Sequence, residues 1–378
     1  MKRTGRSLAC ALKKAVPSIH LWPAAYARVV RNLVKFVNRM KPNFTRRKIY
    51  FILFCFFIFT PSCEFDRSTI GSLDEPELNY NFINDYEFET NRYFFIDTYY
   101  MNRYEKGFSE DLQTWSYEPG TLIRELNVYK SAGYTDRITR MGVASIPSKL
   151  EEFYNLTSLD DIPIKSGETE VGEFVSLVQG RDYVYNYALG YFNLSFKVKD
   201  SDILAIAYRT DHDTVGTLQT MISEDDTSQY YVLRLIKSQT MSENYTQIWP
   251  LMMRNVYFLG DTSFVRKGFN IHIRRKDNNS EIQEVGVKRS FAHLLGLDLT
   301  DENGALLDNG DGQADNNYYL CNLHTGTLIF PGIQPFNPLP DSRFQIADTN
   351  RVYQYNTTDR QKMMASSKFE IVVQYIKQ

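Results

Sequence analysis

The stretch ILAIAY at residues 203–208 is a short, nearly continuous apolar run that is followed by turn residues at 211–213. A run of this length is typical of a strand that is buried on both faces. Residues 122–129, 231–237 and 269–275 instead alternate with a period of two, which predicts half-buried strands. Turn residues recur between these segments, so most of the chain is expected to be β-sheet.

Short helices are expected between the strands. Pro250 suits the first position of a helix with an apolar body at residues 251–259, and Gly260 suits the position just beyond its end. Residues 93–108 contain aromatic side chains at mixed spacing and could form another helix that packs against the sheet.

One more short helix is expected at residues 291–295. Ser290 can cap its N-terminus, and Gly296 is suited to stop it. A few short helices among many strands predict an α+β fold, in which the helices cover one face of a mainly antiparallel sheet.

Trp249, Met252 and Met253 lie around the expected helix at Pro250. Such large and adaptable side chains could line a recognition groove. The alternative is that they form a packed face of the core.

The composition indicates a β-rich protein of the cell envelope or surface. The chain has 378 residues, of which 43% are hydrophobic, and 26 Tyr and 25 Phe dominate its 14% aromatic share. This is enough apolar material to build a core. Tyrosine also suits strands, because it presents a ring to its neighbours and a hydroxyl to water.

The net charge of -2 conceals an asymmetry along the chain. Residues 1–62 contain many Lys and Arg and no Asp or Glu, so the chain after Cys63 is distinctly acidic. A nucleic-acid-binding domain would present a basic face, so nucleic acid is not an expected partner. Only Cys63 and Cys321 fall within the expected mature chain, so a framework of disulfide bonds is not expected.

A basic segment, KPNFTRRK at residues 41–48, precedes the apolar run IYFILFCFFIFT at residues 49–60. This order is that of a secretory signal peptide, and the run is shorter than the ~20 apolar residues of a transmembrane helix. We therefore expect a signal peptide at residues 40–62 that starts at Met40, and an extension at residues 1–39 that is not translated. The alternative for the extension is a basic amphipathic arm, although two prolines interrupt its helical spacing.

Ser62 directly before Cys63 resembles a lipoprotein signal, in which the cysteine becomes lipidated and is the first mature residue. Thr60 stands where that signal prefers leucine, so simple cleavage after Ser62 is the alternative. Residues 63–92 are polar and acidic and are expected to form a tether. The folded domain is expected at residues 93–378.

Distinctive phrases follow one another along this domain. They are IRELNVYK at 123–130, LGYFNLSFKVKDSDILAIAYRT at 189–210, YYVLRLIKSQ at 230–239, IWPLMMRNVYFLG at 248–260, LLGLD at 294–298, NGDGQAD at 309–315, GTLIFPGIQPF at 326–336 and KFEIVVQYIKQ at 368–378. In this order they resemble the N-terminal-type domain of the SprA family, the giant outer-membrane channels of type IX secretion and gliding motility. The resemblance covers most of the chain after about residue 93. Its specificity lies in the order of the phrases, since none of them is a catalytic motif.

The resemblance implies a non-enzymatic part of an outer-membrane translocon. Its partners would be the other parts of a SprA-like barrel, accessory translocon subunits and secreted cargo. The family carries this domain in far longer chains, and this one stops within the strand-like phrase at 368–378, so we expect a C-terminally truncated domain. The alternative is a stand-alone surface or periplasmic lipoprotein that binds a protein or a glycan. Both functions place the chain in the cell envelope, at the outer membrane or the cell surface.

The loop at residues 308–315 resembles part of a calcium-binding loop, because oxygen ligands surround a glycine turn. The candidate ligands are Asp308, Asn309, Asp311 and Asp315. Leu307 and Tyr318 occupy the first and twelfth positions, where strong ligands are missing, so at most weak calcium binding is expected. The alternative is a polar turn without a metal. No other cofactor is expected.

No other set of residues indicates catalytic chemistry. His212 lies between Asp211 and Asp213, but adjacent side chains in a hairpin rarely converge on one metal. The chain contains no G-x-S-x-G, phosphate-binding loop, H-E-x-x-H or Rossmann glycine motif. We therefore expect that the protein is not an enzyme.

Overall fold

The computed structural model describes much of the chain beyond residue 76. The described residues are 77–107, 118–134, 138–155, 158–160, 162–223, 229–282, 289–337 and 351–377. They all lie within the unit Glu75–Gln378. Their regular structure is mostly strand with a few short helices, which confirms the expected α+β class. The predicted extension, signal peptide and Cys63 lie outside the described residues.

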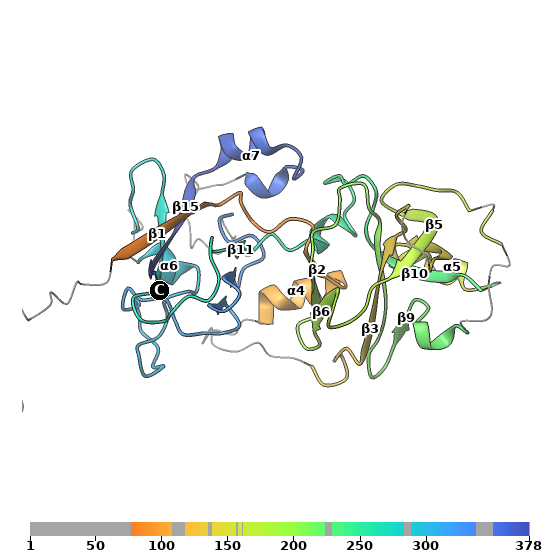
Figure 1. Ribbon diagram of the computed structural model, residues 1–378, viewed down its shortest axis with the longest axis horizontal. Helices are drawn as coiled ribbons and strands as arrows, with labels where there is room; N and C mark the ends of the chain where they lie inside the picture. The colour runs from red at the N-terminus through yellow and green to blue at the C-terminus, as the bar shows by residue number, and fades with distance from the viewer. Residues whose placement is uncertain are drawn as a thin grey trace, which may run out of the picture. The chain divides into compact units, whose positions relative to one another are not determined.

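Five strands of the largest sheet close into a ring. They are β3 (Glu125–Ser131), β4 (Arg140–Ser145), β5 (Thr169–Ser176), β8 (Leu204–Arg209) and β10 (Tyr231–Lys237). β3 pairs with β5 and β8, β4 pairs with β5 and β10, and the pairing of β10 with β8 completes the circle. Figure 1 shows β3, β5 and β10 of this ring in the same part of the molecule as α5. Only the β10–β4 pairing among these is parallel. The sheet is therefore mainly antiparallel, as predicted.

The apolar run that predicted a buried strand forms β8. Its residues from Leu204 to Ala207 have no exposed surface, because β8 pairs with β3 along one edge and with β10 along the other. The short strand β9 (Thr214–Val215) pairs with the end of β8. Pairing on both edges and packing on both faces explain why this run lacks the alternation of its neighbours.

Helix α5 (Pro147–Phe153) packs on the ring next to β4 and β10. Its buried residues Leu150 and Phe153 form a small apolar cluster with Val143 and Val232. Proline at the first turn suits this helix, because an N–H group there has no partner within the helix.

A second sheet joins the two ends of the described chain. β1 (Leu78–Asn84) and β12 (Asn270–Arg275) flank β15 (Phe369–Ile376) on either side, and both pairings are antiparallel. The strand-like phrase at residues 368–378 is therefore the central strand of this sheet.

The tether expected at residues 63–92 is wrong in its described part, which starts at residue 77. Ile83 within β1 and Phe88 beyond it are buried. The carboxylate of Asp85 accepts the N–H groups of Lys368 and Phe369, each at 2.8 Å. The polar composition was misleading because β1 carries asparagines between its apolar residues, and such a segment can pair as an edge strand.

Two three-stranded antiparallel sheets complete the strands. One contains β2 (Tyr93–Phe95), β7 (Tyr191–Leu194) and β6 (Tyr183–Asn186). The other contains β11 (Val256–Phe258), β14 (Thr327–Ile329) and β13 (Cys321–Asn322).

The helix predicted at residues 250–259 is wrong. Only the 3₁₀ turn η4 (Trp249–Leu251) is helical there, and Met252 already has extended backbone angles, φ −70° and ψ 120°. Met252 forms a bridge to Phe94, and the chain continues into β11. A continuous apolar segment fits a buried strand as well as a buried helix, and pairing with β14 decides the outcome.

The remaining helix predictions are confirmed in part. α6 (Phe291–Leu294) begins after Ser290, whose hydroxyl accepts the N–H of His293 at 3.1 Å, and Gly296 follows it with a φ of 78°. In residues 93–108, strand β2 precedes helix α4 (Thr98–Gly107). The other helical segments are η3 (Gln219–Met221), η6 (Val352–Gln354) and α7 (Arg360–Ser366).

The helices were expected to cover one face of a single sheet, and this prediction is wrong. α5 packs on the ring, whereas α6 packs against β12 of the second sheet. No helix within the described ranges has the length and apolar character needed to cross a membrane.

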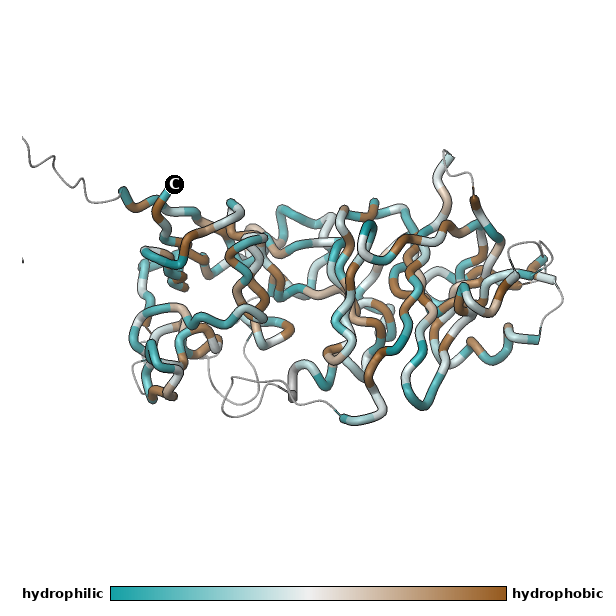
Figure 2. The backbone as a smooth tube through the Cα atoms, turned by 60° about the horizontal axis from the view of Figure 1, so that its bottom comes forward, coloured by the Kyte–Doolittle hydropathy of each residue, from teal (hydrophilic) through white to brown (hydrophobic). Residues whose placement is uncertain are grey.

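One hydrophobic cluster connects the ring with the other sheets. Figure 2 shows hydrophobic stretches along many of the segments that cross one another and hydrophilic stretches in many of the loops that project outward. Tyr257 packs edge-on against Phe330 and Phe336, with ring centroids 5.5 and 6.1 Å apart, and Phe336 stacks on Phe369 at 5.4 Å. These aromatic rings pack together where β11, β15 and the segment after β14 meet.

Removal of a side chain from β10 is expected to destabilise the fold. Leu233 has no exposed surface, so Leu233→Ala should lower the free energy of unfolding by about 2–5 kcal/mol through lost burial and a cavity. The matched control is Leu306→Ala, because Leu306 is 55% exposed and should change stability by no more than about 0.5 kcal/mol. Urea denaturation followed by circular dichroism measures both values. Equal losses for the two variants would contradict the central position of β10.

Candidate binding pocket

Protein hydrogen bonds hold the loop that was predicted to bind calcium. The buried carboxylate of Asp298 accepts the N–H groups of Asp311 and Gly312 at 2.9 and 3.1 Å. Asp315 accepts the N–H groups of residues 299–300 and a threonine hydroxyl, at 2.8–3.1 Å. Burial raises the pKa of Asp298, and the two N–H groups oppose that shift.

The carboxylates of this loop do not gather around one point. Within the described ranges, no three side chains of His, Cys, Asp or Glu form a group that could hold a metal. This arrangement favours the polar turn, which was the alternative considered from the sequence. Weak calcium binding by Asp308, Asn309, Asp311 and Asp315 stays a prediction.

Calcium is expected to bind this loop with a dissociation constant no lower than ~10⁻⁴ M, because both oxygens of Asp315 already accept protein hydrogen bonds. Isothermal titration calorimetry of calcium chloride into the full chain measures the affinity. Asp311→Ala serves as the comparison, because it removes one of the four candidate ligands and should weaken any residual binding further. A submicromolar affinity that Asp311→Ala abolishes would show that the loop is a calcium site.

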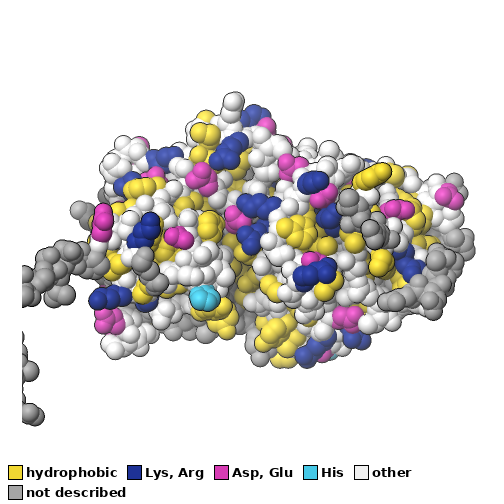
Figure 3. Space-filling model, viewed as in Figure 1, with side chains coloured by type: hydrophobic (Ala, Val, Ile, Leu, Met, Phe, Trp, Pro, Cys, Tyr) yellow, Lys and Arg dark blue, Asp and Glu magenta, His cyan; other side chains and the backbone are white. Residues whose placement is uncertain are grey.

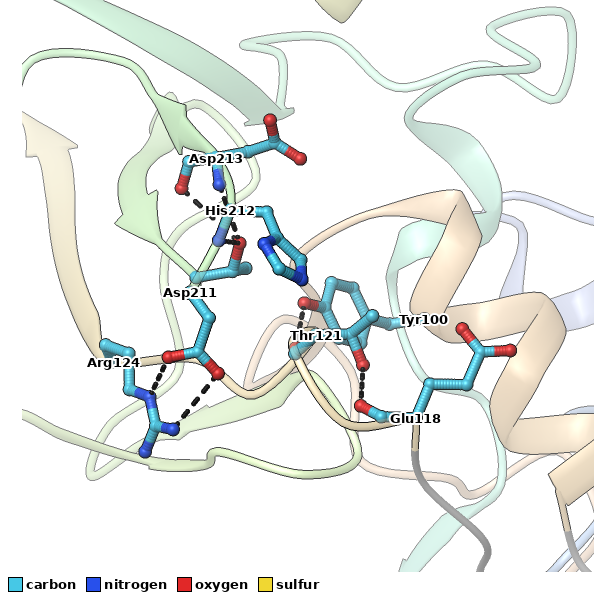
Figure 4. A network of polar contacts seen from close by, with 8 residues as sticks. Tyr100, Glu118, Thr121, Arg124, Asp211, His212 and Asp213 are labelled. Atoms are coloured by element: carbon cyan, nitrogen blue, oxygen red, sulfur yellow. Dashed lines mark hydrogen bonds and ion pairs between the residues drawn. The ribbon is translucent and has the colours of Figure 1, made fainter.

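The side chains of the hairpin that carries His212 do not form a metal site. Figure 4 shows Asp211 turned toward Arg124, with which it makes two hydrogen bonds of 2.6 and 3.0 Å, and Asp213 directed away from the imidazole. The ring of His212 lies against Gly120, whose φ is 92°, and a Cβ there would come within 2.2 Å of Nε2. His212 thus packs on a glycine turn, and its neighbouring carboxylates do not converge on it.

Two further histidines have protein partners. Nδ1 of His293 lies 2.7 Å from the carbonyl oxygen of Asp298. Nδ1 of His272 lies 3.3 Å from the carboxylate of Glu281, and its Nε2 lies 3.2 Å from the amide of Asn270. These contacts indicate structural roles for both residues.

A pocket of about 220 Å³ lies beside the end of β10 and the η4 turn. Amide and hydroxyl groups provide much of its polar lining, together with three ionisable side chains. The amide and hydroxyl residues are Asn91, Gln239, Thr240, Asn356, Thr357 and Thr358. The ionisable residues are Asp200, Lys237 and Arg254. Trp249 and Met252 contribute to the wall, whereas Met253 is buried in the core.

Lys237, the last residue of β10, is buried at one side of this pocket. Its Nζ donates to the carbonyl oxygens of Asp200, Asp202 and Ser238 at 2.5, 2.7 and 3.2 Å. Burial lowers the pKa of Lys237 to about 8, and the nearby carboxylates of Asp200 and Asp202 oppose that shift. The ammonium group therefore has all its donors satisfied but keeps its charge next to the pocket.

Arg254 lies in the segment between η4 and β11 and is 4% exposed. Its Nη1 donates to the carbonyl oxygen of Trp249 at 3.1 Å, and its guanidinium carbon lies 4.3 Å from the centre of the Trp249 ring. Its Nε has no hydrogen-bond partner. Burial lowers the pKa of Arg254 to about 10. The residue also lines an adjoining cavity of about 40 Å³, which shares Trp249 and Met252 with the pocket.

Sequence reasoning identified Trp249 and Met252 but missed Lys237 and Arg254. Arg254 interrupts the apolar phrase WPLMMRNV, and a charge inside such a phrase is the signal that could have found it. Lys237 ends the phrase YVLRLIK, where a lysine is not unusual, so no comparable signal marked it. The polar side chains of residues 356–358 carried no such signal, because only the fold brings them to the pocket.

Lys237 should make the stability of the protein depend on pH. Its pKa is about 8 in the folded state, whereas an unfolded lysine titrates near ~10.4, so between these values the unfolded chain binds more protons. The contribution of Lys237 to the free energy of unfolding therefore rises as pH increases from about 8 to about 10.5.

Comparison of the wild type with Lys237→Met isolates this contribution, because tyrosines and other shared groups cancel in the difference. Urea denaturation at several pH values should show the wild type gaining stability relative to Lys237→Met over this interval. A difference that stays constant or falls with pH would mean that the folded protein does not depress the pKa of Lys237.

A scan against models of known protein families finds no match to this chain. A search of curated proteins likewise finds no relative.

Proposed function

We propose that this chain is an exported, non-enzymatic envelope component that acts as part of a SprA-like translocon in type IX secretion and gliding motility. The order of the phrases between residues 123 and 378 carries the proposal. These phrases coincide with core elements of the fold, which supports the resemblance.

The phrase at 189–210 contains β7 and β8, and the phrase at 230–239 contains β10. The phrases at 326–336 and 368–378 contain β14 and β15. Each contributes side chains to the main hydrophobic cluster. Because buried segments determine a fold more strongly than surface loops do, proteins that share these phrases in this order are expected to share the fold.

In this proposal the chain acts by binding. Its partners are the other parts of a SprA-like barrel, accessory translocon subunits and secreted cargo, and it reaches the membrane through a lipid on Cys63 or through the barrel. Nucleic acid is not a proposed partner. Figure 3 shows Lys and Arg interspersed with Asp and Glu on the face that it displays, where a polyanion-binding surface would be predominantly basic.

The second candidate function is that of a stand-alone surface or periplasmic lipoprotein that binds a protein or a glycan. The pocket beside η4 favours this candidate, because it combines an aromatic wall with several amide and hydroxyl groups. Ligand sites of proteins commonly join apolar surfaces to a few convergent polar groups.

Deletion of the gene in its own host, with complementation by the wild type or by Cys63→Ala, tests the translocon function. The deletion should reduce the amount of type IX cargo in the culture medium and abolish gliding, because cargo could no longer cross the outer membrane. The wild type should restore both. Cys63→Ala should restore less, since a chain that cannot be lipidated would be lost from the membrane fraction. Quantitative mass spectrometry of the medium measures cargo release.

Proteins that reach only the periplasm serve as the control and should not change in amount. Normal cargo release and normal gliding in the deletion strain would contradict the translocon function. A membrane-associated, lipid-modified wild-type protein in that case would leave the lipoprotein as the function to pursue.

A further inference from the structure

Arg254 is a buried cation that forms no ion pair with an Asp or Glu of the described residues. Burial dominates the lowering of its pKa, and among the described residues the group that opposes this effect is Tyr353, a neutral phenol whose own pKa burial raises. A buried charge without a counter-ion is unfavourable by several kcal/mol, so it is seldom retained for stability alone.

Arg234 provides a comparison within the same protein. It is 1% exposed, yet Asp97 lies 3.2 Å from its Nε, which also donates to the carbonyl oxygen of Ile96 at 2.9 Å. One nitrogen of Arg234 also lacks a partner, but its charge is compensated by a carboxylate. Arg234 does not line the pocket. Arg254 has no such carboxylate among the described residues, and it does line the pocket.

The charges around the pocket favour an anion. Lys237 and Arg254 carry positive charge, and Asp200 is the one carboxylate among the lining residues. Asp200 is itself engaged, because its Oδ1 accepts the amide of Asn91 at 2.7 Å. The donors of Lys237 are occupied by carbonyl groups, whereas Nε of Arg254 has no hydrogen-bond partner.

We propose that this pocket binds a small carboxylate ligand, with the carboxylate on the guanidinium group of Arg254. A guanidinium group matches a carboxylate with two parallel hydrogen bonds, and the contact with the Trp249 ring holds its plane in place. Amide and hydroxyl side chains of the lining can bind further polar groups of the ligand. This inference does not depend on a role in secretion.

The volume limits the size of the ligand. At about 220 Å³ the pocket is smaller than the ~300–1,000 Å³ of sites that enclose drug-sized molecules. A single sugar acid or the C-terminal residue of a peptide fits this description. Both ligands present one carboxylate beside hydrogen-bonding groups. A titration with each of them distinguishes a sugar acid from a peptide C-terminus.

The fluorescence of Trp249 reports on binding, because this ring forms part of the wall. The full chain with Trp22→Phe and Trp115→Phe retains Trp249 as its one tryptophan. It should be titrated with glucuronate and with glucose, and with a tripeptide whose C-terminus is free or amidated. Saturable quenching is expected for one of the two carboxylates and not for its neutral counterpart. The carboxylate that binds identifies the source. The absence of saturation by both, or equal binding of a neutral counterpart, overturns the proposal.

Arg254→Met removes the charge and preserves the length of the side chain. It should weaken carboxylate binding by at least about 10-fold, because a charge-assisted hydrogen bond is lost, and it should not lower the midpoint of thermal unfolding, because an uncompensated buried charge is removed. The matched control is Arg274→Met, which removes an arginine that pairs with Glu370 away from the pocket and should leave binding unchanged.

If Arg254→Met fails to fold, Arg254→Lys takes its place, since it keeps the charge without the planar pair of donors. Arg254→Lys should fold and bind the carboxylate more weakly than the wild type. Undiminished binding by a folded Arg254 variant would show that another group holds the anion.

Discussion

Strand β10 is the element on which most of the described structure depends. It pairs with β8 along one edge and with β4 along the other, so the ring is closed only when β10 is in place. Arg234 in this strand donates to the carbonyl oxygen of Ile96 and pairs with Asp97, which ties the link between β2 and α4 to the ring. At the end of the strand, Lys237 draws the carbonyl groups of residues 200–202 toward the pocket. Ring closure and pocket geometry therefore depend on the same strand.

The buried cations differ in how their charge is balanced, and this difference separates structural from binding roles. Arg234 has a carboxylate, and Lys237 has three backbone carbonyls. Arg254 has one carbonyl and the face of an indole ring. The indole ring offers weaker electrostatic compensation than a carboxylate does. A ligand carboxylate would supply what the protein does not, and its binding energy would offset the burial of Arg254.

Local patterns in the sequence predicted the structure correctly where residues close to one another in the sequence determine it. The apolar run of β8 and the Ser290 cap with Gly296 behind it were predicted for this reason. The helix at Pro250 and the tether over β1 failed because their strand partners, β14 and β15, lie far away in the sequence. The pocket was hidden for the same reason, since it joins β10, η4 and residues 356–358, and no pattern within one segment shows that these meet.

The pairing of β1 with β15 has a consequence for the order of folding. The hydroxyl of Tyr375 meets the side chain of Asn81 at 3.3 Å across 294 residues of sequence. When the chain appears N-terminus first, β1 therefore stays without its partner strand β15 until nearly all of the described residues have followed. Such long-range pairing is slow, because loop closure precedes any gain from the contact. During this interval Tyr80 and Phe82, which stay about half exposed even in the folded protein, lie on an unpaired strand edge that is prone to aggregation. A holding chaperone that shields residues near β1 would then set the yield of folded protein more strongly than the final stability does.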